Sequence, residues 1–252
     1  MHEVKPSVIL LEHDFDISLE RTLCALESNL VNVYTAFRRC YKGGENDTFL
    51  EYNTDSDEIN ISHIKEFISK MRKSPHESPL EFGKLTFSIS GVSRSFSHQW
   101  VRSRIASHAQ MSQRYVDHSN LDVVVPESIK NNSEAYMRYT YLIGQIEDFY
   151  NDLVTKYEVP KEDARYILNE GTATAIVSQF NFRELIHIFK ERCCNRTQWE
   201  YRYVANEMLR LCKQYYPCVF ENVGPKCIDD RTGKFLGCPE AHPCGNPPVK
   251  KE

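Results

Sequence analysis

The sequence predicts a single α+β domain, and three observations point to that class. The 252-residue chain has 41% hydrophobic and 26% charged residues, which is typical of a globular protein large enough to bury a core. Its apolar residues repeat at strand spacing in some stretches and at helix spacing in others. The two kinds of stretch are mixed without regular β-α-β alternation, which favours α+β over a doubly wound sheet.

The composition argues against several classes of protein. With only ten glycines and neither a G-x-G-x-x-G nor a G-x-x-x-x-G-K-[ST] motif, Rossmann and P-loop sites lose their support. A net charge of −4 disfavours a general nucleic-acid binder, and no stretch approaches the ~18 apolar residues of a membrane span. The first apolar run, Val8 to Leu11, is too short for a signal peptide. We therefore expect a cytoplasmic protein with reduced thiols and no membrane partner.

The first part of the chain is expected to alternate strands and helices. The expected elements are a strand at residues 7–12, a helix at 16–30, an acidic surface loop at 43–60 and a helix at 62–72. Ser62 can cap the second helix. Leu85, Phe87 and Ile89 alternate with polar residues, which predicts a strand with one buried face that ends at Gly91.

The second part is expected to be mainly helical. The expected elements are a helix from Ser97, its N-cap, to Gln113, a short strand at 121–126, and helices at 133–157, after Pro160, at 182–191 and at 196–216. Residues 217–245 form a Cys-bearing tail rich in Pro and Gly, and residues 246–252 are expected to be a disordered C-terminus. The predicted domain spans residues 1–245.

The most informative stretch runs from Gly91 to Asp117. It contains four arginines and no acidic residue before Asp117, so an anionic ligand is expected to supply the missing negative charge. On the expected helix, Arg102 and Arg104 would lie about 200° apart and would reach two ligands, or one ligand at a subunit boundary. A surface helix with ordinary salt bridges is the less favoured alternative.

These residues resemble a known signature. Arg102-Ser103-Arg104, seven residues, then Ser112 and Gln113-Arg114-Tyr115 is similar to the Arg-His-Arg, seven residues, Ser signature of the flavin-dependent thymidylate synthases. Further blocks match that family in the same order: a turn at 36–41, His76 to Glu81, Val92 to Arg94 with His98-Gln99, Asn181 to Gln198-Trp199-Glu200, and the Cys-bearing tail. The resemblance covers residues 34–245 and identifies a divergent member, with Ser103 where the family has His.

The resemblance implies a reaction and an assembly. The family converts dUMP to dTMP by reductive methylation of uracil carbon 5. FAD is the cofactor, and methylenetetrahydrofolate and NADPH are co-substrates. The implied fold is an antiparallel or mixed sheet packed with long helices, in a homotetramer with active sites at subunit interfaces.

The resemblance also implies roles for individual residues. The residues implied in FAD binding are Ser78, Arg102, Ser103, Arg104, Asn181, Arg183 and His187. Those implied in nucleotide binding are Gln99, Gln110, Ser112, Arg114, Arg165, Arg192 and Tyr115. The implied catalytic residues are Arg192, for charge on the uracil, His76, near folate and flavin with Tyr115, and Ser112. Arg114 and Arg165 are candidates for the nucleotide phosphate, and a Gln amide offers both a donor and an acceptor to uracil.

Ser112 has two possible roles. A nucleophile would need an adjacent base, and His108 would lie one helical turn earlier on the expected helix. The flavin chemistry needs no covalent adduct with the enzyme, so a substrate-positioning donor is favoured.

Departures from the family pattern at Ser103, at Phe82 and at residues 168–170 keep two alternatives open. One is a related methylase or hydroxymethylase acting on UMP or dUMP. The other is a catalytically weak protein that binds flavin or nucleotide. An RNA-binding arginine patch is disfavoured by the net charge.

The remaining features have simpler interpretations. Trp100 and Trp199 are expected in the core, and His63 and His118 on the surface. The nine cysteines contain no C-x-x-C pair, so a structural zinc site is disfavoured and no metal is predicted.

Overall fold

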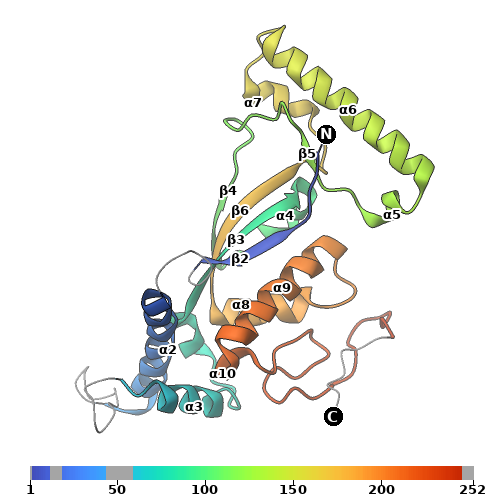
Figure 1. Cartoon of the computed structure of the whole chain (residues 1–252). Helices are drawn as coiled ribbons and strands as arrows, with labels where there is room; N and C mark the ends of the chain where they lie inside the picture. Colours follow the sequence, from blue (N-terminus) through green and yellow to red (C-terminus); the bar gives the residue numbers. More distant parts are fainter. Residues whose placement is uncertain (1, 12–18, 44–58, 246–252) are drawn as a thin grey trace. The chain divides into compact units, whose positions relative to one another are not determined.

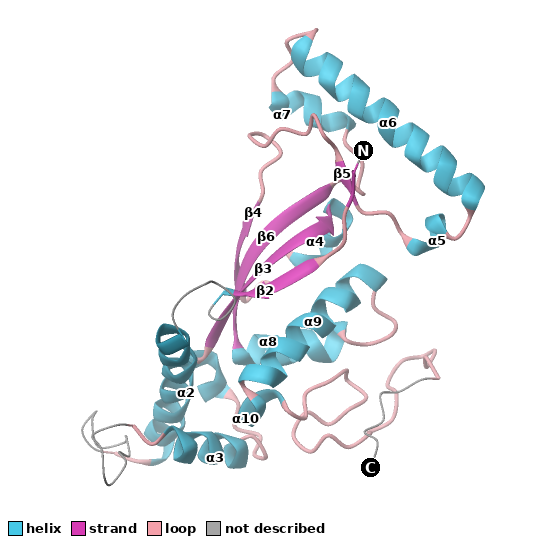
Figure 2. Ribbon diagram, in the orientation of Figure 1, coloured by secondary structure: helices cyan, strands magenta, loops and turns pink. Residues whose placement is uncertain are grey.

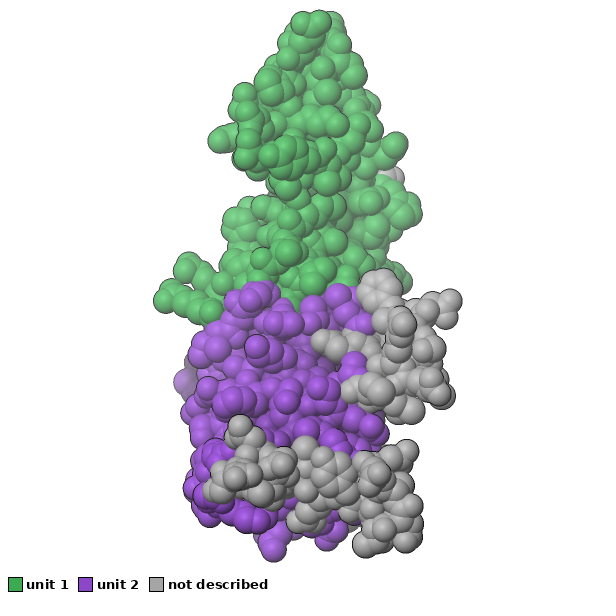
Figure 3. Space-filling view, turned by 90° about the vertical axis from the view of Figure 1, so that its left-hand side faces the viewer, with its two compact units in different colours: residues 1–8, 88–104, 108–178 green, residues 9–87, 105–107, 179–252 purple. Residues whose placement is uncertain are grey.

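The computed structural model divides the chain into two compact units (Figure 3). Unit 1 comprises residues 1–8, 88–104 and 108–178, and unit 2 comprises residues 9–87, 105–107 and 179–252. The structure describes residues 2–11, 19–43 and 59–245, and the predicted 43–60 loop and C-terminal 246–252 segment fall almost wholly outside that part. The predicted single domain over residues 1–245 stays a prediction.

The strands form a two-stranded and a four-stranded sheet (Figure 1). β1 (His2–Glu3) pairs in parallel with β5 (Asp122–Val123). The larger sheet has the order β2-β3-β6-β4, with β2 at Ser7–Leu10, β3 at Lys84–Ser93, β4 at Ala106–Gln110 and β6 at Ala173–Asn181. The backbone N–H of Phe182 donates to the carbonyl of Gly83 and that of Arg94 to Thr172, so β3 and β6 run antiparallel.

In unit 1, short helices and one long helix surround a small apolar core. The helices are α4 (Arg94–Trp100), α5 (Glu127–Lys130), α6 (Ser133–Thr155), α7 (Lys161–Ala164) and the 3₁₀ turn η3 (Arg165–Ile167). The core cluster contains Leu121, Val123, Val125 and Ile143, so β5 and the residues on either side of it pack against α6. The 133–157 helix is thereby confirmed.

Unit 2 is built mainly of helices (Figure 2). They are α2 (Leu19–Tyr41), α3 (Ile61–Met71), the 3₁₀ turn η2 (Ser78–Phe82), α8 (Phe182–Arg192), α9 (Trp199–Tyr215) and α10 (Pro217–Phe220). α2 packs on α3 and η2, while α8 packs on α9 and η2. The mixture of helices and strands confirms the α+β class. α2 extends beyond residue 30 to Tyr41, so the 36–41 block is helical and the expected turn was wrong.

The expected helix from Ser97 to Gln113 was also wrong. Its first turn belongs to α4, which begins earlier because the Ser93 hydroxyl caps it by accepting from the Phe96 N–H at 3.0 Å. Residues 106–110 form β4, in which half-buried and exposed positions alternate. Val101 and Ile105 are exposed. Pairing with β6 outweighed the local helical pattern.

Four smaller expectations also need correction. α3 is capped by the Asn60 side chain and not by Ser62. Gly91 does not end β3; it lies inside the strand at φ 65°, where a Cβ would overlap the Lys5 carbonyl. Trp100 is buried as expected, but Trp199 is 37% exposed, and His118 is only 4% exposed. His63 is half-buried.

None of the described helices is both long and apolar enough to cross a membrane.

Candidate functional site

The Arg102–Ser103–Arg104 segment lies in a turn directly after α4. The turn is closed by backbone bonds from Arg102 N–H to the Gln99 carbonyl at 3.2 Å and from Ser103 N–H to the Trp100 carbonyl at 3.1 Å. Arg102 and Arg104 are exposed, and within the described residues no ion pair or side-chain hydrogen bond engages either guanidinium. The expected opposition of the two arginines around a helix therefore fails, but their availability to an anion remains.

A network of hydrogen bonds beneath the surface holds this turn in place. The indole N–H of Trp100 donates to the Ser178 hydroxyl oxygen at 2.8 Å, and His108 Nδ1 lies 2.8 Å from the same oxygen. His108 Nε2 lies 3.1 Å from the Ser103 carbonyl, which only accepts, so Nε2 carries the hydrogen. In the neutral ring the Ser178 hydroxyl then donates to Nδ1. His108 thus fixes the backbone of Ser103, a role that the sequence did not indicate.

The side-chain amide nitrogen of Gln110, at the end of β4, is already hydrogen-bonded within the protein. Nε2 donates to the Ser97 hydroxyl at 2.9 Å and to the Thr174 hydroxyl at 3.3 Å. With both hydrogens used, only the amide oxygen can face a ligand. Gln110 was expected to offer uracil both a donor and an acceptor, but in this structure it can offer only an acceptor.

Ser112 follows β4 in a turn, where its hydroxyl accepts from the Arg114 N–H at 3.3 Å. His108 lies on β4, and its two ring nitrogens are directed at Ser178 and Ser103. The proposed helical juxtaposition of His108 with Ser112 does not exist. This placement favours the positioning role for Ser112.

Arg114 and Arg165 both contact Glu162, which is far from Arg114 in sequence but only three residues before Arg165. Arg114 Nη2 lies 2.8 Å from the Glu162 carboxylate, and Arg165 Nε donates to the Glu162 carbonyl at 2.9 Å. The hydrogen bond to Glu162 raises the pKa of Arg114 above its ordinary value. The absence of acidic residues between Gly91 and Asp117 therefore did not predict an absence of acidic partners in space. The two candidates for the nucleotide phosphate are nonetheless brought to one place.

Arg165 also lies near a third, partly buried arginine, Arg94. Burial lowers the pKa of Arg94 most, Glu170 raises it, and the charge of Arg165 lowers it further. Two arginines therefore lie close enough to repel one another, which suits an anion. Gln99 is half-buried on α4, and Tyr115 is 75% exposed beside Arg114.

In unit 2, His76 is held between two hydroxyl groups. Its Nδ1 lies 2.8 Å from the Tyr41 hydroxyl and its Nε2 3.1 Å from the Ser78 hydroxyl. Beside it, α2 and η2 enclose a pocket of about 440 Å³ lined by Ala36, Arg39, Ser78 and Phe82, among others. Two blocks of the sequence resemblance, from α2 and from 76–81, therefore form one pocket.

α8 carries the other candidates of unit 2. The Asn181 side chain caps the helix by accepting from the Glu184 N–H at 2.8 Å, so it has a structural role. Arg183 Nη1 lies 2.6 Å from the Glu81 carboxylate of η2, next to the Ser78 pocket. His187 is exposed one turn after Arg183, on the same side of the helix. Arg192, in the last turn, lies over the Tyr201 ring at 4.7 Å.

The predicted residues are divided between the two units. The unit 1 group contains Gln99, Arg102, Ser103, Arg104, Gln110, Ser112, Arg114, Tyr115 and Arg165, and the unit 2 group contains His76, Ser78, Asn181, Arg183, His187 and Arg192. Sequence reasoning missed Glu162, Ser178 and Tyr41. Ser178 was the one visible signal among these three, because it stands at strand spacing between the apolar Ile176 and Phe180.

Comparison with known proteins identifies a family that this chain matches. Residues 23–218 match the model of the Thy1 family, described as thymidylate synthase complementing protein. The flavin-dependent thymidylate synthase of Nitratidesulfovibrio vulgaris is 39% identical over 234 residues, covering 87% of this chain and 91% of that protein. The enzyme of the same name from Geobacter sulfurreducens is 40% identical over 82% of this chain and 85% of its own. That from Pyrococcus furiosus is 39% identical over 75% and 79%.

Proposed function

We propose that this chain, which belongs to the Thy1 family of thymidylate synthase complementing proteins, is a flavin-dependent thymidylate synthase. It methylates carbon 5 of the uracil of dUMP to form dTMP, with FAD as cofactor. Methylenetetrahydrofolate supplies the one-carbon unit, and NADPH supplies the reducing equivalents.

The observation that carries this proposal is the exposed pair Arg102 and Arg104 on a turn fixed by His108. A dinucleotide cofactor has a diphosphate, and guanidinium groups bind phosphate oxygens in a bidentate way. The donors of this turn therefore fit FAD without a Gly-rich loop. Ser103 contributes its carbonyl to the His108 contact, so Ser can replace His without loss of this backbone support. In unit 2, Ser78, Asn181, Arg183 and His187 are the remaining candidates for FAD.

Six further groups are proposed to bind the nucleotide. Arg114 and Arg165 bind the phosphate near Glu162, and Gln99, Ser112 and the oxygen of Gln110 orient the uracil. Arg192 is held over Tyr201, and its charge stabilises negative charge that develops on the uracil. Bound flavin supplies hydride chemistry that no side chain can provide. His76, between Tyr41 and Ser78, and the exposed Tyr115 orient the folate against the flavin.

A homotetramer with active sites between subunits is part of the proposal. Met137, Tyr141, Leu142 and Phe149 on α6 are 63%, 69%, 53% and 49% exposed. Such a row of large apolar side chains is typical of a surface that another protein covers. Contact with a second copy would remove it from water.

The direct test is the absorption spectrum of the purified protein during turnover. We expect yellow protein that NADPH bleaches, and that methylenetetrahydrofolate with dUMP reoxidises while dTMP forms. UMP in place of dUMP is the control. Product from UMP alone would support the related methylase or hydroxymethylase, and flavin binding without any product would support the catalytically weak alternative.

Ser112→Ala separates the two roles of that residue. A positioning donor predicts a raised KM for dUMP with most turnover retained at saturation, whereas a nucleophile predicts loss of turnover.

A further inference from the structure

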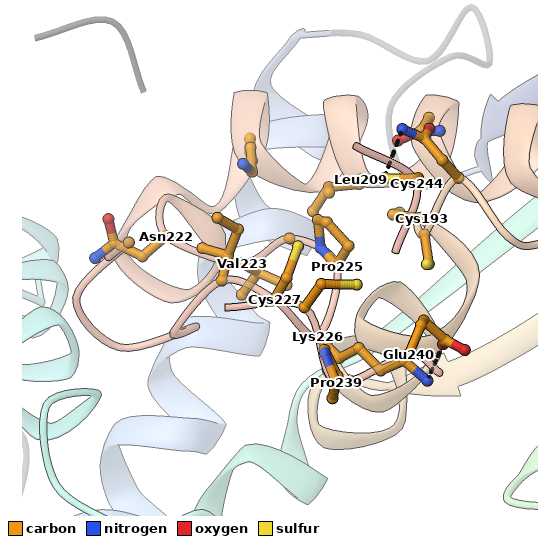
Figure 4. A pocket seen from close by; sticks show the side chains of 18 of the residues that line it. Cys193, Leu209, Asn222, Val223, Pro225, Lys226, Cys227, Pro239, Glu240 and Cys244 are labelled. Carbon is orange, nitrogen blue, oxygen red and sulfur yellow. Dashed lines mark hydrogen bonds and ion pairs between the residues drawn. The ribbon is translucent and has the colours of Figure 1, made fainter. Parts of the chain in front are cut away.

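Five cysteines line one pocket of unit 2 that the proposed reaction does not use. The pocket has a volume of about 520 Å³ and lies among the end of α8, α9 and the tail (Figure 4). The cysteines are Cys193, Cys194, Cys227, Cys238 and Cys244. They come from the residues after α8 and from separate points of the tail, so the fold gathers thiols that are far apart in sequence.

Cys227 lies close enough to three of the other thiols for their charges to act on it. The pKa of Cys227 is raised first by burial and then by the negative charges that Cys238, Cys194 and Cys244 carry when ionised. Cys193 differs, because burial raises its pKa to about 12 and Cys194 is the only thiol that contributes. Asn195 Nδ2 donates to the sulfur of Cys244 at 3.7 Å. Such an N–H contact orients a sulfur and stabilises its charged form.

The tail that carries three of these cysteines has little regular structure. After α10 ends at Phe220, the described residues form loops (Figure 2), with one isolated bridge between Ile228 and Phe235. Lys226 pairs with Glu191 at 3.5 Å and with Glu240 at 2.6 Å. Few large apolar side chains are available to hold the end of the tail, since Phe235 and Leu236 are exposed. Loop segments of this kind are commonly fixed by a disulfide or a metal ion. The cysteines of this pocket are not joined by disulfides.

We propose that Cys194, Cys227, Cys238 and Cys244 together bind one Zn²⁺ ion. Each thiol releases its proton to solvent, and four Zn–S bonds form in a tetrahedron. Glycines with positive φ, Gly237 at 96° and Gly245 at 70°, adjoin Cys238 and Cys244 and allow the tight turns that such ligands need. The ion fastens the tail to the end of α8, which carries Arg192.

Binding requires the thiols to move closer together. Among the described residues, no group of three His, Cys, Asp or Glu side chains already stands in the geometry of a metal site. Cys244 is exposed and Cys238 is half-buried, so the parts of the tail that must move are not locked in a core. Protonated thiols do not attract one another. A bound dication neutralises the thiolates and so allows them to approach.

The first experiment measures metal in the full-length protein purified under reducing conditions. After incubation with Zn²⁺ and desalting, we expect about one Zn²⁺ per chain, held by four thiolates. Co²⁺ substitution gives the geometry, since tetrahedral cobalt thiolate absorbs in the red, where oxidised flavin does not. Less than about one tenth of an equivalent of zinc, or the octahedral cobalt spectrum, overturns the proposal.

Matched serine variants locate the site. Cys194→Ser is expected to abolish the red cobalt band and tight zinc retention, while Cys193→Ser, one residue earlier, retains both. Cys218→Ser, outside the pocket, is a second control. Equal retention in all three variants overturns the assignment, as does an iron–sulfur chromophore or a disulfide among these cysteines in the wild-type protein. Metal content is read independently of turnover, so failure here leaves the proposed reaction standing.

Discussion

One arginine in unit 2 and a pair of arginines in unit 1 show how differently the same side chain is used. Arg72, at the C-terminal end of α3, is 5% exposed, and its Nη2 lies 2.8 Å from the Asp230 carboxylate. Its Nε also donates to the Val219 carbonyl at 3.2 Å. Arg102 and Arg104, in unit 1, are exposed, and no acidic side chain of the described residues pairs with them. A buried guanidinium is matched by the fold itself, whereas an exposed unmatched pair is available to a ligand.

This difference predicts that substitutions in the two regions change different measured quantities. Loss of a partner of Arg72 should reduce stability, and loss of Arg102 or Arg104 should reduce ligand binding. Each variant below tests whether that division holds.

The largest effect is expected for Asp230→Ala. Removing this carboxylate leaves the buried Arg72 charge with only the Glu77 carboxylate, 3.9 Å away, and it takes from the Lys190 ammonium a partner at 3.0 Å. Breaking a buried pair in this way costs about 3–5 kcal/mol of the free energy of unfolding. Urea unfolding measures the loss. Glu66→Ala, an exposed carboxylate on α3, is the control and should lie within about 0.5 kcal/mol of wild type. Equal stability of the two variants would remove the structural role of Arg72.

The next effect concerns Arg102→Ala. One charge-assisted hydrogen bond contributes about 1.5–3 kcal/mol, so FAD affinity should fall about 10- to 100-fold while the melting temperature stays unchanged. Fluorescence titration of the flavin-free protein gives the affinity. Arg210→Ala, an exposed arginine on α9 paired with Glu207, is the matched control. A drop in melting temperature without a change in FAD affinity would reverse the comparison.

These cases also mark what the sequence could predict. Apolar periodicity located α6, α8 and α9, because each buries one face against its own unit. It misplaced residues 97–113, because β4 depends on pairing with β6, far along the chain. The arginine cluster was recognisable from its local charge. The pairing of Arg114 with Glu162 was not, since the two residues are 48 positions apart in sequence. Local patterns therefore found the candidate groups, and tertiary contacts decided which of them are already occupied.

A smaller effect is expected from pH. Burial opposes ionisation of Asp230, but hydrogen bonds from Arg72 and Lys190 outweigh it and hold the pKa of this carboxyl below its usual value. Its stabilisation is therefore fully present above the unfolded-state pKa of about 3.9 and is lost as pH falls through the lower folded-state value. Urea unfolding from pH 6 to pH 3 should show Asp230→Asn converging on wild type only at the acidic end. A constant difference over that range would contradict the shifted pKa.

The smallest effect is expected at Arg114, which is paired, unlike Arg102 and Arg104, but is exposed, unlike Arg72. Its partner Glu162 is 49% exposed, so water and salt screen the pair, and Glu162→Gln should leave the melting temperature unchanged. The substitution frees the Arg114 guanidinium for a phosphate, so dUMP affinity should rise by roughly a few-fold at low salt and less at high salt. Isothermal titration gives both values, and Glu134→Gln, which removes the exposed partner of Arg138, is the control. Weaker dUMP binding in Glu162→Gln would mean that the carboxylate orients Arg114 for the ligand and does not compete with it.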